Sequence, residues 1–232
     1  MFNGIASDID RSSFVNGIQG DFSYNLNDSN ILRSGFFASN DQTQNASNNL
    51  VFATDINGDQ ASSDPFAVNQ SSGKNSQLYG IYLQNEWKAL EKLTINYGAR
   101  FDVSHAYVNE SQVSPRFGAV YDLSKKTKIH AGYSRYFTPP PTAIIASSSL
   151  SKFQGTTNAS ENIQNDKVKA ERTNYYDVGV SHQMTKNLTF SLDGYYKDIK
   201  NLLDEGQFGN ALIYTPFNYQ YGKAYGLEFT AD

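Results

Sequence analysis

The chain has 232 residues, a formal net charge of −4 at pH 7 and no cysteine. Nucleic-acid binding requires a basic face, so the acidic balance argues against a nucleic-acid partner. Without cysteine there is neither a disulfide framework nor a thiolate metal site, and no run reaches the ~18 apolar residues of a membrane-spanning helix. Aromatic residues make up 14% of the chain, which suits the aromatic belts of membrane proteins better than an ordinary core.

The N-terminal third contains two weakly alternating segments and one long polar segment. The N-terminus lacks the basic region and the apolar region that make up a signal peptide. If the protein is exported, we therefore expect its start to lie outside this sequence. Strands are predicted at Ser13–Leu26 and Asn30–Ser39, with a turn at Asn25–Ser29 between them. Residues 40–76 are rich in Asn, Ser, Asp and Gln and predict a long loop. Within it, Asp55–Asp59 resembles a calcium loop but lacks the later Glu, which favours a solvated loop.

Two strongly alternating segments follow at Ser76–Lys88 and Leu93–Ser104, with a turn at Ala89–Lys92. In the second segment an apolar residue occupies every other position, and Arg100 and Asp102 fall on the opposite face. An arginine on the lipid face near mid-membrane would cost roughly 2–4 kcal/mol. We therefore predict that Arg100 and Asp102 point into a lumen and that the odd-numbered face contacts lipid.

The stretch from Ser114 to Pro141 is predicted to be a hairpin with the polar turn Ser124–Thr127. Alternation over about ten residues exceeds the five or six of an average globular strand and matches the ~9–11 of a tilted membrane-crossing strand. Tyrosines lie at the ends of both arms, where a ring can sit in hydrocarbon and its hydroxyl in water. This combination is typical of a wall strand of an outer-membrane barrel.

The remaining sequence continues the same pattern. A second long loop is predicted at Thr138–Arg172, opened by three prolines that cannot donate to a ladder. Strands are predicted at Thr173–Met184 and Leu188–Ile199, followed by a third long loop at Asn201–Gly222. A last strand is predicted at Ala224–Asp232.

Connection lengths distinguish two ends of the predicted sheet. The turns near residues 27, 90, 125 and 186 are short, whereas the connections at 40–76, 138–172 and 201–222 are long and 105–113 is the short member of that second set. Short turns on one rim and long loops on the other are typical of the periplasmic and extracellular sides of a barrel. We predict an all-β fold: an antiparallel transmembrane β-barrel, partial, with about nine to ten strands. A soluble β-sandwich is the alternative, but it has no reason to segregate its loops.

From Tyr79 onward the chain resembles the β-barrel domain of TonB-dependent outer-membrane receptors. Four blocks carry the resemblance: LYGIYLQNEWKALEKLTINYGARFD, SPRFGAVYDLSKKTKIHAGYSRYFTPP, KAERTNYYDVGVSHQMTKNLTFSLDGYYKDIKNLL and GKAYGLEFTA. The resemblance implies a barrel of about 22 strands around a plug domain and a segment near the N-terminus that binds TonB. Residues 1–232 are accordingly expected to be a partial barrel domain, with the plug domain and the C-terminal strands outside them.

The function implied by the resemblance is energised uptake of a scarce ligand, such as siderophore-iron or cobalamin, across the outer membrane of a Gram-negative bacterium. The expected partners are outer-membrane lipid and lipopolysaccharide, the plug domain, the TonB complex and an unknown small-molecule ligand. An isolated sheet with two unpaired edges is not expected to transport by itself. The alternative is a structural or adhesive outer-membrane β-sheet protein that displays polar loops.

No catalytic constellation is present, because the three histidines are far apart in the sequence. We therefore expect no enzyme activity, no cofactor and no metal site. Arg135 lies on the apolar face near the extracellular end, where it is expected to reach lipopolysaccharide phosphate. For the inward-facing charged residues, salt bridges and plug contacts are the first expectation and ligand contact the second. Loop aromatics suit ligand contact, so the candidate contacts are Tyr107, Phe153, Phe208, Arg100, Asp102 and Arg116.

Overall fold

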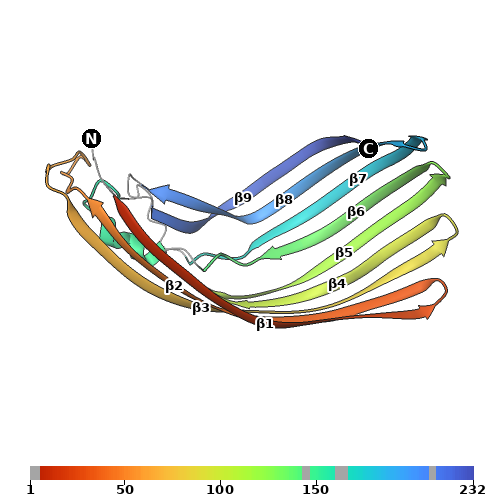
Figure 1. The fold of residues 1–232 in the computed structure, drawn as a ribbon, viewed down its shortest axis with the longest axis horizontal. Coiled ribbons are helices and arrows are strands. Elements are labelled where there is room, and N and C mark those ends of the chain that lie inside the picture. Colours follow the sequence, from red (N-terminus) through yellow and green to blue (C-terminus); the bar gives the residue numbers. More distant parts are fainter. Residues whose placement is uncertain (1–5, 143–146, 160–166, 209–212) are drawn as a thin grey trace.

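The computed structural model describes residues 6–142, 147–159, 167–208 and 213–232. Over these residues, nine strands form one sheet in which every strand pairs antiparallel with the next along the chain. Figure 1 shows the sheet curved into a half-barrel, with tight turns at one end and longer connections at the other. The elements are β1 (Ser7–Asn27), β2 (Asn30–Val51), β3 (Phe66–Leu90), β4 (Leu93–His105), β5 (Asn109–Ser124), β6 (Thr127–Thr138), the short 3₁₀ helix η1 (Ser147–Phe153), β7 (Glu171–Thr185), β8 (Leu188–Phe208) and β9 (Ile213–Ala231).

Four connections at one end of the sheet are two residues long, and they lie at the short turns that the sequence predicted. They are polar and mostly charged, and they lie at residues 28–29, 91–92, 125–126 and 186–187. In the first of them the Asn27 side chain accepts a hydrogen bond from the backbone N–H of Ser29 at 3.0 Å. A polar turn that closes its own hydrogen bonds remains in water while the strands on either side enter a different environment. We call this end of the sheet the turn end and the opposite end the loop end.

The strands continue further toward the loop end than the sequence indicated. Residues 40–76 are mostly strand, because β2 and β3 remain paired as far as Val51↔Phe66 and only residues 52–65 connect them. The predicted loop at 201–222 is also wrong: β8 runs to Phe208 and β9 begins at Ile213. Where both faces of a strand meet water, backbone hydrogen bonds hold the strands together and the side chains on the two faces need not differ in hydropathy. The alternation of apolar and polar residues that predicts a strand is therefore missing from the sequence.

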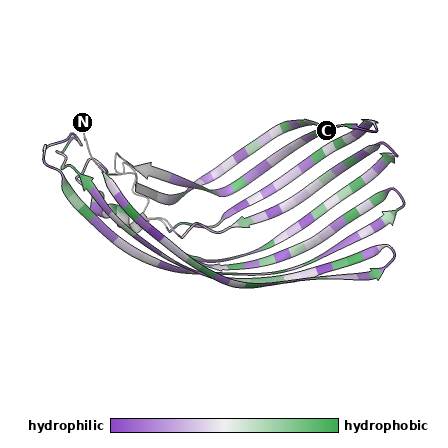
Figure 2. Ribbon diagram, viewed as in Figure 1, coloured by the Kyte–Doolittle hydropathy of each residue, from purple (hydrophilic) through white to green (hydrophobic). Residues whose placement is uncertain are grey.

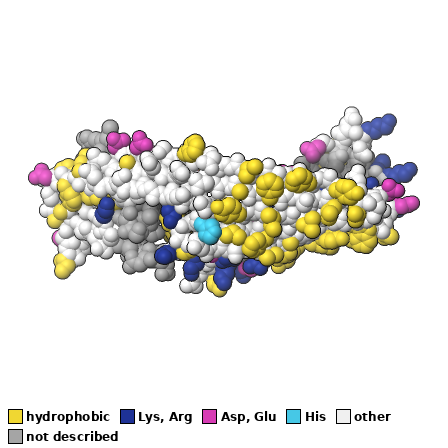
Figure 3. Space-filling view, turned by 90° about the horizontal axis from the view of Figure 1, so that it is seen from below, with side chains coloured by type: hydrophobic (Ala, Val, Ile, Leu, Met, Phe, Trp, Pro, Cys, Tyr) yellow, Lys and Arg dark blue, Asp and Glu magenta, His cyan; other side chains and the backbone are white. Residues whose placement is uncertain are grey.

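The two faces of the sheet differ in chemistry, and the predicted inward and outward faces are confirmed. The register places Ile81, Leu83 and Phe101 on the convex face, and Arg100 and Asp102 on the concave face. Figures 2 and 3 show hydrophobic residues concentrated over the half of the sheet nearest the turn end. Ile81 is 61% exposed. Soluble proteins rarely expose a continuous apolar surface as large as this half of the convex face. In addition, β1 and β3, with 21 and 25 residues, are longer than the ~9–11 residues needed to cross hydrocarbon.

The small hydrophobic core of the described residues lies on the concave face at the loop end. It joins Val51, Leu150 and Phe153, with Val68 packed against it. The connection between β6 and β7 folds back onto the end of β2 and adds backbone pairing there, with an isolated bridge between residues 53 and 156. None of the helical residues in the described ranges forms a helix long and apolar enough to span a membrane.

We expect the convex face to be in contact with lipid in the intact protein. Single spin labels at Leu83, Ile95, Ala99 and Ala131 should be accessible to oxygen and shielded from a nickel chelate, because all four positions face outward. Labels at Gln84 and Ser134, which face the concave side, serve as controls and should show the opposite preference. Water-like accessibility at Ala99 would contradict the assignment.

Gly98 provides a test of how closely neighbouring strands approach. A Cβ at this position would lie 2.6 Å from the Cα of Gln84 on the next strand, whereas a Cβ at Gly118 would meet only the carbonyl oxygen of Ala131 at 4.0 Å. Overpacking against backbone costs about 1–3 kcal/mol. We expect Gly98→Ala to lower the free energy of unfolding by that amount, measured by urea unfolding in vesicles, and Gly118→Ala to leave it unchanged. Equal losses would show that the strand spacing adapts.

Candidate functional site

An ion pair lies across the middle of the concave face. Arg100 Nε donates to Asp102 Oδ1 at 2.6 Å, and Asp102 is only 5% exposed. Gly80 on the neighbouring strand is in register with Asp102, and a Cβ there would come within 2.8 Å of both partners. The glycine therefore makes room for the pair. The register confirms the predicted inward orientation of both candidates. Arg100 neutralises the nearly buried carboxylate of Asp102, so both side chains are already engaged in a structural salt bridge.

A second polar contact on the concave face also lies over a glycine of a neighbouring strand. Tyr82 Oη donates to Asp21 Oδ1 at 2.8 Å, and the missing side chain of Gly35 gives the tyrosine ring space. Next to it lies a hollow of about 340 Å³ whose lining includes Phe37 and Leu78. The hollow combines apolar rings with a tyrosine and a carboxylate, a mixture typical of ligand-contacting surfaces.

His130 forms a third polar cluster nearer the turn end. Its Nε2 lies 3.1 Å from Asp193 Oδ1 and 3.6 Å from Asp177 Oδ2. The register places His130 on the concave face, because His130 is paired with Gly179, which is itself paired with Asp193. In the described part of the chain, no group of three or more His, Cys, Asp or Glu side chains is arranged to hold a metal ion.

Toward the loop end the concave face is covered by uncharged polar side chains. Apart from Val51, its buried side chains on β2, β3 and β5 are amides and hydroxyls, namely Thr43, Asn45, Ser47, Asn49, Gln70, Gln112 and Ser114. Within the described residues, the Nδ2 of Asn45 and both side-chain polar atoms of Gln70 have no hydrogen-bond partner. A buried polar atom without a partner costs free energy, so these groups are ready to bind water or a polar ligand.

Among the aromatic candidates, Phe153 is not a surface residue. It is fully buried against Val51 and Leu150, and burial of a phenylalanine stabilises by roughly 1.5–3 kcal/mol. The prediction that Phe153 meets ligand in an open loop is therefore corrected: it holds the β6–β7 connection against β2. For Phe208 the backbone ends β8, and its side chain lies outside the described residues.

Tyr107 and Arg116 differ in their surroundings. Tyr107 lies in the short β4–β5 turn, where Lys74 Nζ is 5.4 Å from its ring centroid. Burial raises the pKa of Tyr107 to about 12, so its phenol stays neutral at any physiological pH. Arg116 is exposed on the concave face, in register with Gly98, and has no ion pair within the described ranges. It is thus the one candidate cation whose charge remains open to a ligand or another part of the protein.

The loop at Asp55–Asp59 uses its carboxylate internally, in keeping with the solvated loop that the sequence favoured. Asp55 Oδ1 accepts hydrogen bonds from the backbone N–H groups of Asn57 and Asp59, both at 2.9 Å. The N–H groups of Asp59 and Asn57 hold the pKa of Asp55 below its usual value. The carboxylate therefore stabilises a turn.

The ladder between β5 and β6 opens toward the loop end. Its last pair is Arg116↔Ser134, one residue short of Pro115, whose nitrogen carries no hydrogen. Above this point the Gln112 side chain takes over, with Nε2 donating to the backbone oxygen of Tyr136 at 2.9 Å. A proline within a predicted strand was the one signal in the sequence that pairing would stop here.

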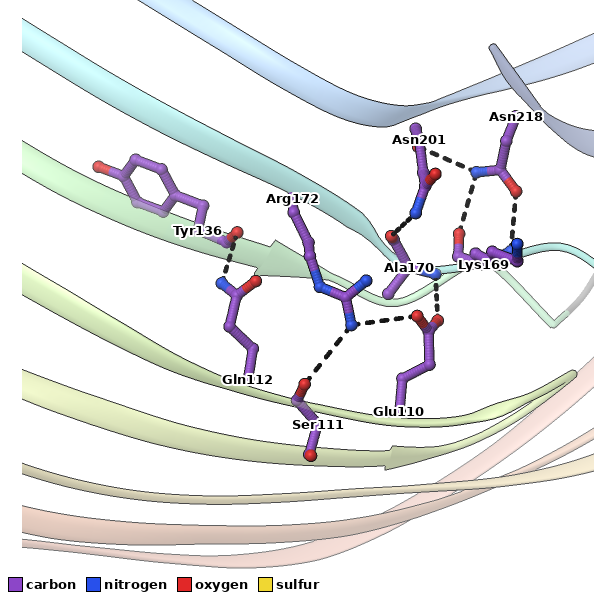
Figure 4. A network of polar contacts seen from close by, with 9 residues as sticks. All are labelled: Glu110, Ser111, Gln112, Tyr136, Lys169, Ala170, Arg172, Asn201 and Asn218. Carbon is purple, nitrogen blue, oxygen red and sulfur yellow. Dashed lines mark hydrogen bonds and ion pairs between the residues drawn. The ribbon is translucent and has the colours of Figure 1, made fainter. Parts of the chain in front are cut away.

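A polar network spans the opening and fixes the start of β7 (Figure 4). Glu110 accepts a hydrogen bond from the backbone N–H of Ala170 and pairs with Arg172 at 3.1 Å. On the other side, Asn218 bonds both the N–H and the carbonyl of Lys169, at 2.8 and 3.0 Å. Nothing in the sequence indicated that these residues form a network, because single polar residues near strand ends follow no periodic pattern.

Comparison with known proteins now identifies the family. A family model described as TonB dependent receptor-like, beta-barrel, matches residues 2–232. The chain belongs to the TonB-dependent receptor family. It is 28% identical over 86 residues to the TonB-dependent transporter Oar of Myxococcus xanthus, a match that covers 33% of this chain and 8% of Oar.

Solved structures of receptors share the fold of this TonB-dependent receptor chain. The FrpB iron transporter from Neisseria meningitidis matches 95% of the chain with a TM-score of 0.67 and 17% identity. The ferric yersiniabactin uptake receptor FyuA from Yersinia pestis matches 99% with 0.65 and 14%. This chain spans 34% of each of these two proteins. At such identities the likeness concerns the fold, and it confirms the predicted all-β architecture, an antiparallel wall of a β-barrel.

Arg100 and Arg116, both on the concave face of the receptor chain, give contrasting predictions. Arg100→Met leaves the buried Asp102 carboxylate unpaired, so we expect a loss of about 1–3 kcal/mol in the free energy of unfolding. Adding Asp102→Asn should recover much of this loss. Arg116→Met should change stability by less than about 0.5 kcal/mol. Urea midpoints in vesicles measure all three, and equal losses for the two arginine variants would contradict the distinction.

Proposed function

We propose that this chain forms part of the wall of an outer-membrane transporter that takes up a scarce ligand, such as an iron chelate or cobalamin, with energy delivered through TonB. The observation that carries the proposal is the pair of unlike faces on one continuous sheet. An apolar convex band suits hydrocarbon, and a polar concave wall that extends past this band suits a ligand path. The plug domain, the TonB complex and a position in the outer membrane of a Gram-negative bacterium are parts of the same proposal.

The family consists of receptors and transporters, and we propose that this chain has no catalytic role. Two solved relatives are described in terms of their cargo, as the copper transporter OprC and the FrpB iron transporter. A ligand that passes along the concave wall of this chain would meet contacts made from several strands. In this chain the corresponding surface near the loop end is formed by amides and hydroxyls, so recognition there would use hydrogen bonds more than charge.

The transport proposal is tested in cells that make the intact protein from its own gene. Uptake of radioactive iron supplied as a panel of ferric chelates, and of radioactive cobalamin, should stop when an uncoupler collapses the proton gradient or when the TonB gene is deleted. A matched strain without the receptor gives the background. Uptake that survives both treatments, or no uptake of any probe above background, would contradict the proposal.

The unpartnered amides provide a test of ligand contact. Asn45 and Gln70 face the concave side, whereas Asn48 and Asn69 face outward and form a cross-strand pair on the same two strands. The Asn45→Ala/Gln70→Ala double variant should raise the half-saturating concentration for uptake about tenfold, because each lost hydrogen bond is worth about 0.5–1.5 kcal/mol. Asn48→Ala/Asn69→Ala should leave it unchanged. Equal effects would place the ligand contacts elsewhere.

A structural or adhesive role remains the second candidate, and one observation favours it. Ile56 lies at the tip of the β2–β3 connection with its side chain fully exposed, where it could contact another surface. If adhesion is the function, Ile56→Asp should abolish attachment of cells to a hydrophobic surface without any change in uptake. If the transport proposal holds, the same variant should leave both measurements unchanged.

A further inference from the structure

Lysines gather at the turn end of the sheet, although the formal net charge of the chain is −4. Six of the 19 basic residues lie within three residues of the β3–β4, β5–β6 and β7–β8 turns, together with two acidic residues, Glu91 and Asp122. The β1–β2 turn has Asp28 and no basic neighbour. Figure 3 shows Lys and Arg side chains, in dark blue, projecting from this end. We call the six lysines the lysine rim, and all of them are exposed: Lys88, Lys92, Lys125, Lys126, Lys128 and Lys186.

The charges of the lysine rim are not neutralised within the described part of the chain. Lys128 Nζ lies 3.8 Å from Asp122 Oδ1, with side chains that are 68% and 47% exposed. So long and exposed a pair contributes little. The other five lysines and Glu91 form no ion pair with any described residue. Most of the positive charge is therefore available to a partner.

Two of the three turns hold their lysines on a fixed backbone. The hydroxyl of Ser124 accepts a hydrogen bond from the backbone N–H of Lys126 at 3.2 Å. In the same way, the hydroxyl of Thr185 accepts one from the backbone N–H of Asn187 at 3.3 Å. Strand pairing continues to the residues that flank both turns. Because these turns are already ordered, a partner that binds the lysines pays less to immobilise the backbone.

The register directs the lysine rim away from lipid. The last outward row before the turns is apolar and consists of Leu90, Leu93, Tyr121, Ile129 and Val180. Lys88 and Lys128, the two rim lysines that lie within strands, face the concave side with His130. Lysines that served lipid headgroups would occupy outward positions instead. The rim therefore faces the aqueous space at this end of the barrel wall.

The spacing of the turns indicates the size of the partner. Neighbouring turns are two strand spacings apart, about 10 Å, and the β3–β4 and β7–β8 turns are about 19 Å apart along the rim. One small anion cannot touch all three turns at once, whereas a polymer with repeated negative groups can. Each exposed contact is weak and screened by salt, but several contacts made by one polymer reinforce one another.

We propose that the lysine rim docks onto peptidoglycan through the free carboxylates of its stem peptides, which rests on the periplasmic position of the short turns in the proposed function. Peptidoglycan is an extended polymer with repeated carboxylates that faces this side of an outer membrane. A lysine ammonium offers three donors on a flexible stem and forms charge-assisted hydrogen bonds with carboxylates. Docking attaches the turn end to the cell wall and leaves the loop end free for a ligand.

The test uses the intact protein in phosphatidylcholine nanodiscs and purified peptidoglycan sacculi, which sediment. The rim variant is Lys92→Gln/Lys125→Gln/Lys126→Gln/Lys186→Gln. The control makes the same change of charge away from the turn end, Lys152→Gln/Lys167→Gln/Lys200→Gln/Lys223→Gln. At about 0.1 M salt, where the Debye length is about 10 Å, the unchanged protein and the control should sediment with sacculi equally. The rim variant should need at least about tenfold more sacculi for half-maximal sedimentation.

Further measurements separate carboxylate binding from a loss of fold. Arginine at the same four rim positions should restore sedimentation, because it keeps the charge. Sacculi whose carboxylates have been converted to neutral amides should bind the unchanged protein as weakly as native sacculi bind the rim variant. Far-UV circular dichroism and heat-modifiable gel mobility check that each variant folds. Equal sedimentation of the rim and control variants, or undiminished binding to amidated sacculi, would overturn the proposal.

Two other partners give different results in the same variants. If the rim meets phospholipid headgroups, native mass spectrometry should show less bound phosphatidylglycerol in the rim variant, with sacculus binding unchanged. If it acts on an anionic cargo, uptake should weaken with sacculus binding unchanged. Either result would overturn the proposal. Sacculus binding requires no energised uptake, so a protein that binds sacculi but takes up no probe would count against the transport proposal alone.

Discussion

The structure depends on one constraint, the pairing of every backbone polar group along a continuous antiparallel ladder. Hydrocarbon offers no hydrogen-bond partner, so a wall strand must satisfy its N–H and carbonyl groups through its two neighbours. Within the described residues, the strand order provides two neighbours for each of the strands from β2 to β8. Because side chains alternate strictly, a slip of one residue would exchange lipid-facing and lumen-facing residues. The register therefore fixes the chemistry of both faces at once.

The same constraint relaxes where the strands leave the apolar band. Water can satisfy free backbone groups there, so the β5–β6 ladder ends at Arg116↔Ser134 and side chains such as Gln112 and Arg172 bridge the opening. The connection between β6 and β7 is attached on both sides of this opening, through Glu110 of β5 on one side and Asn218 of β9 on the other. Phe153 packs the same connection against β2. At this opening side chains replace the backbone ladder, whereas the β2–β3 and β8–β9 ladders continue to the loop end.

Glycines on the concave face allow long polar side chains to lie flat against the wall. Gly80 leaves space for the Arg100–Asp102 pair, and Gly179 does the same for His130 and Asp193. Arg100 and Asp102 are consequently neutralised within the sheet. Arg116 on the same face has no ion pair among the described residues, and nearer the loop end the amides of Asn45 and Gln70 have polar atoms without a partner. This division separates structural polar groups from those open to a ligand.

The sequence by itself determined the strand faces, the positions of the four short turns and the inward orientation of Arg100 and Asp102. Alternation records the difference between lipid on one side and water on the other, and that difference is local. Only the tertiary structure decided that residues 40–51 and 66–76 are strand, because with water on both faces a strand shows no alternation. It also decided that Phe153 is buried. Those facts depend on which residues lie opposite one another on neighbouring strands, and pairing between distant segments is not encoded in any local pattern.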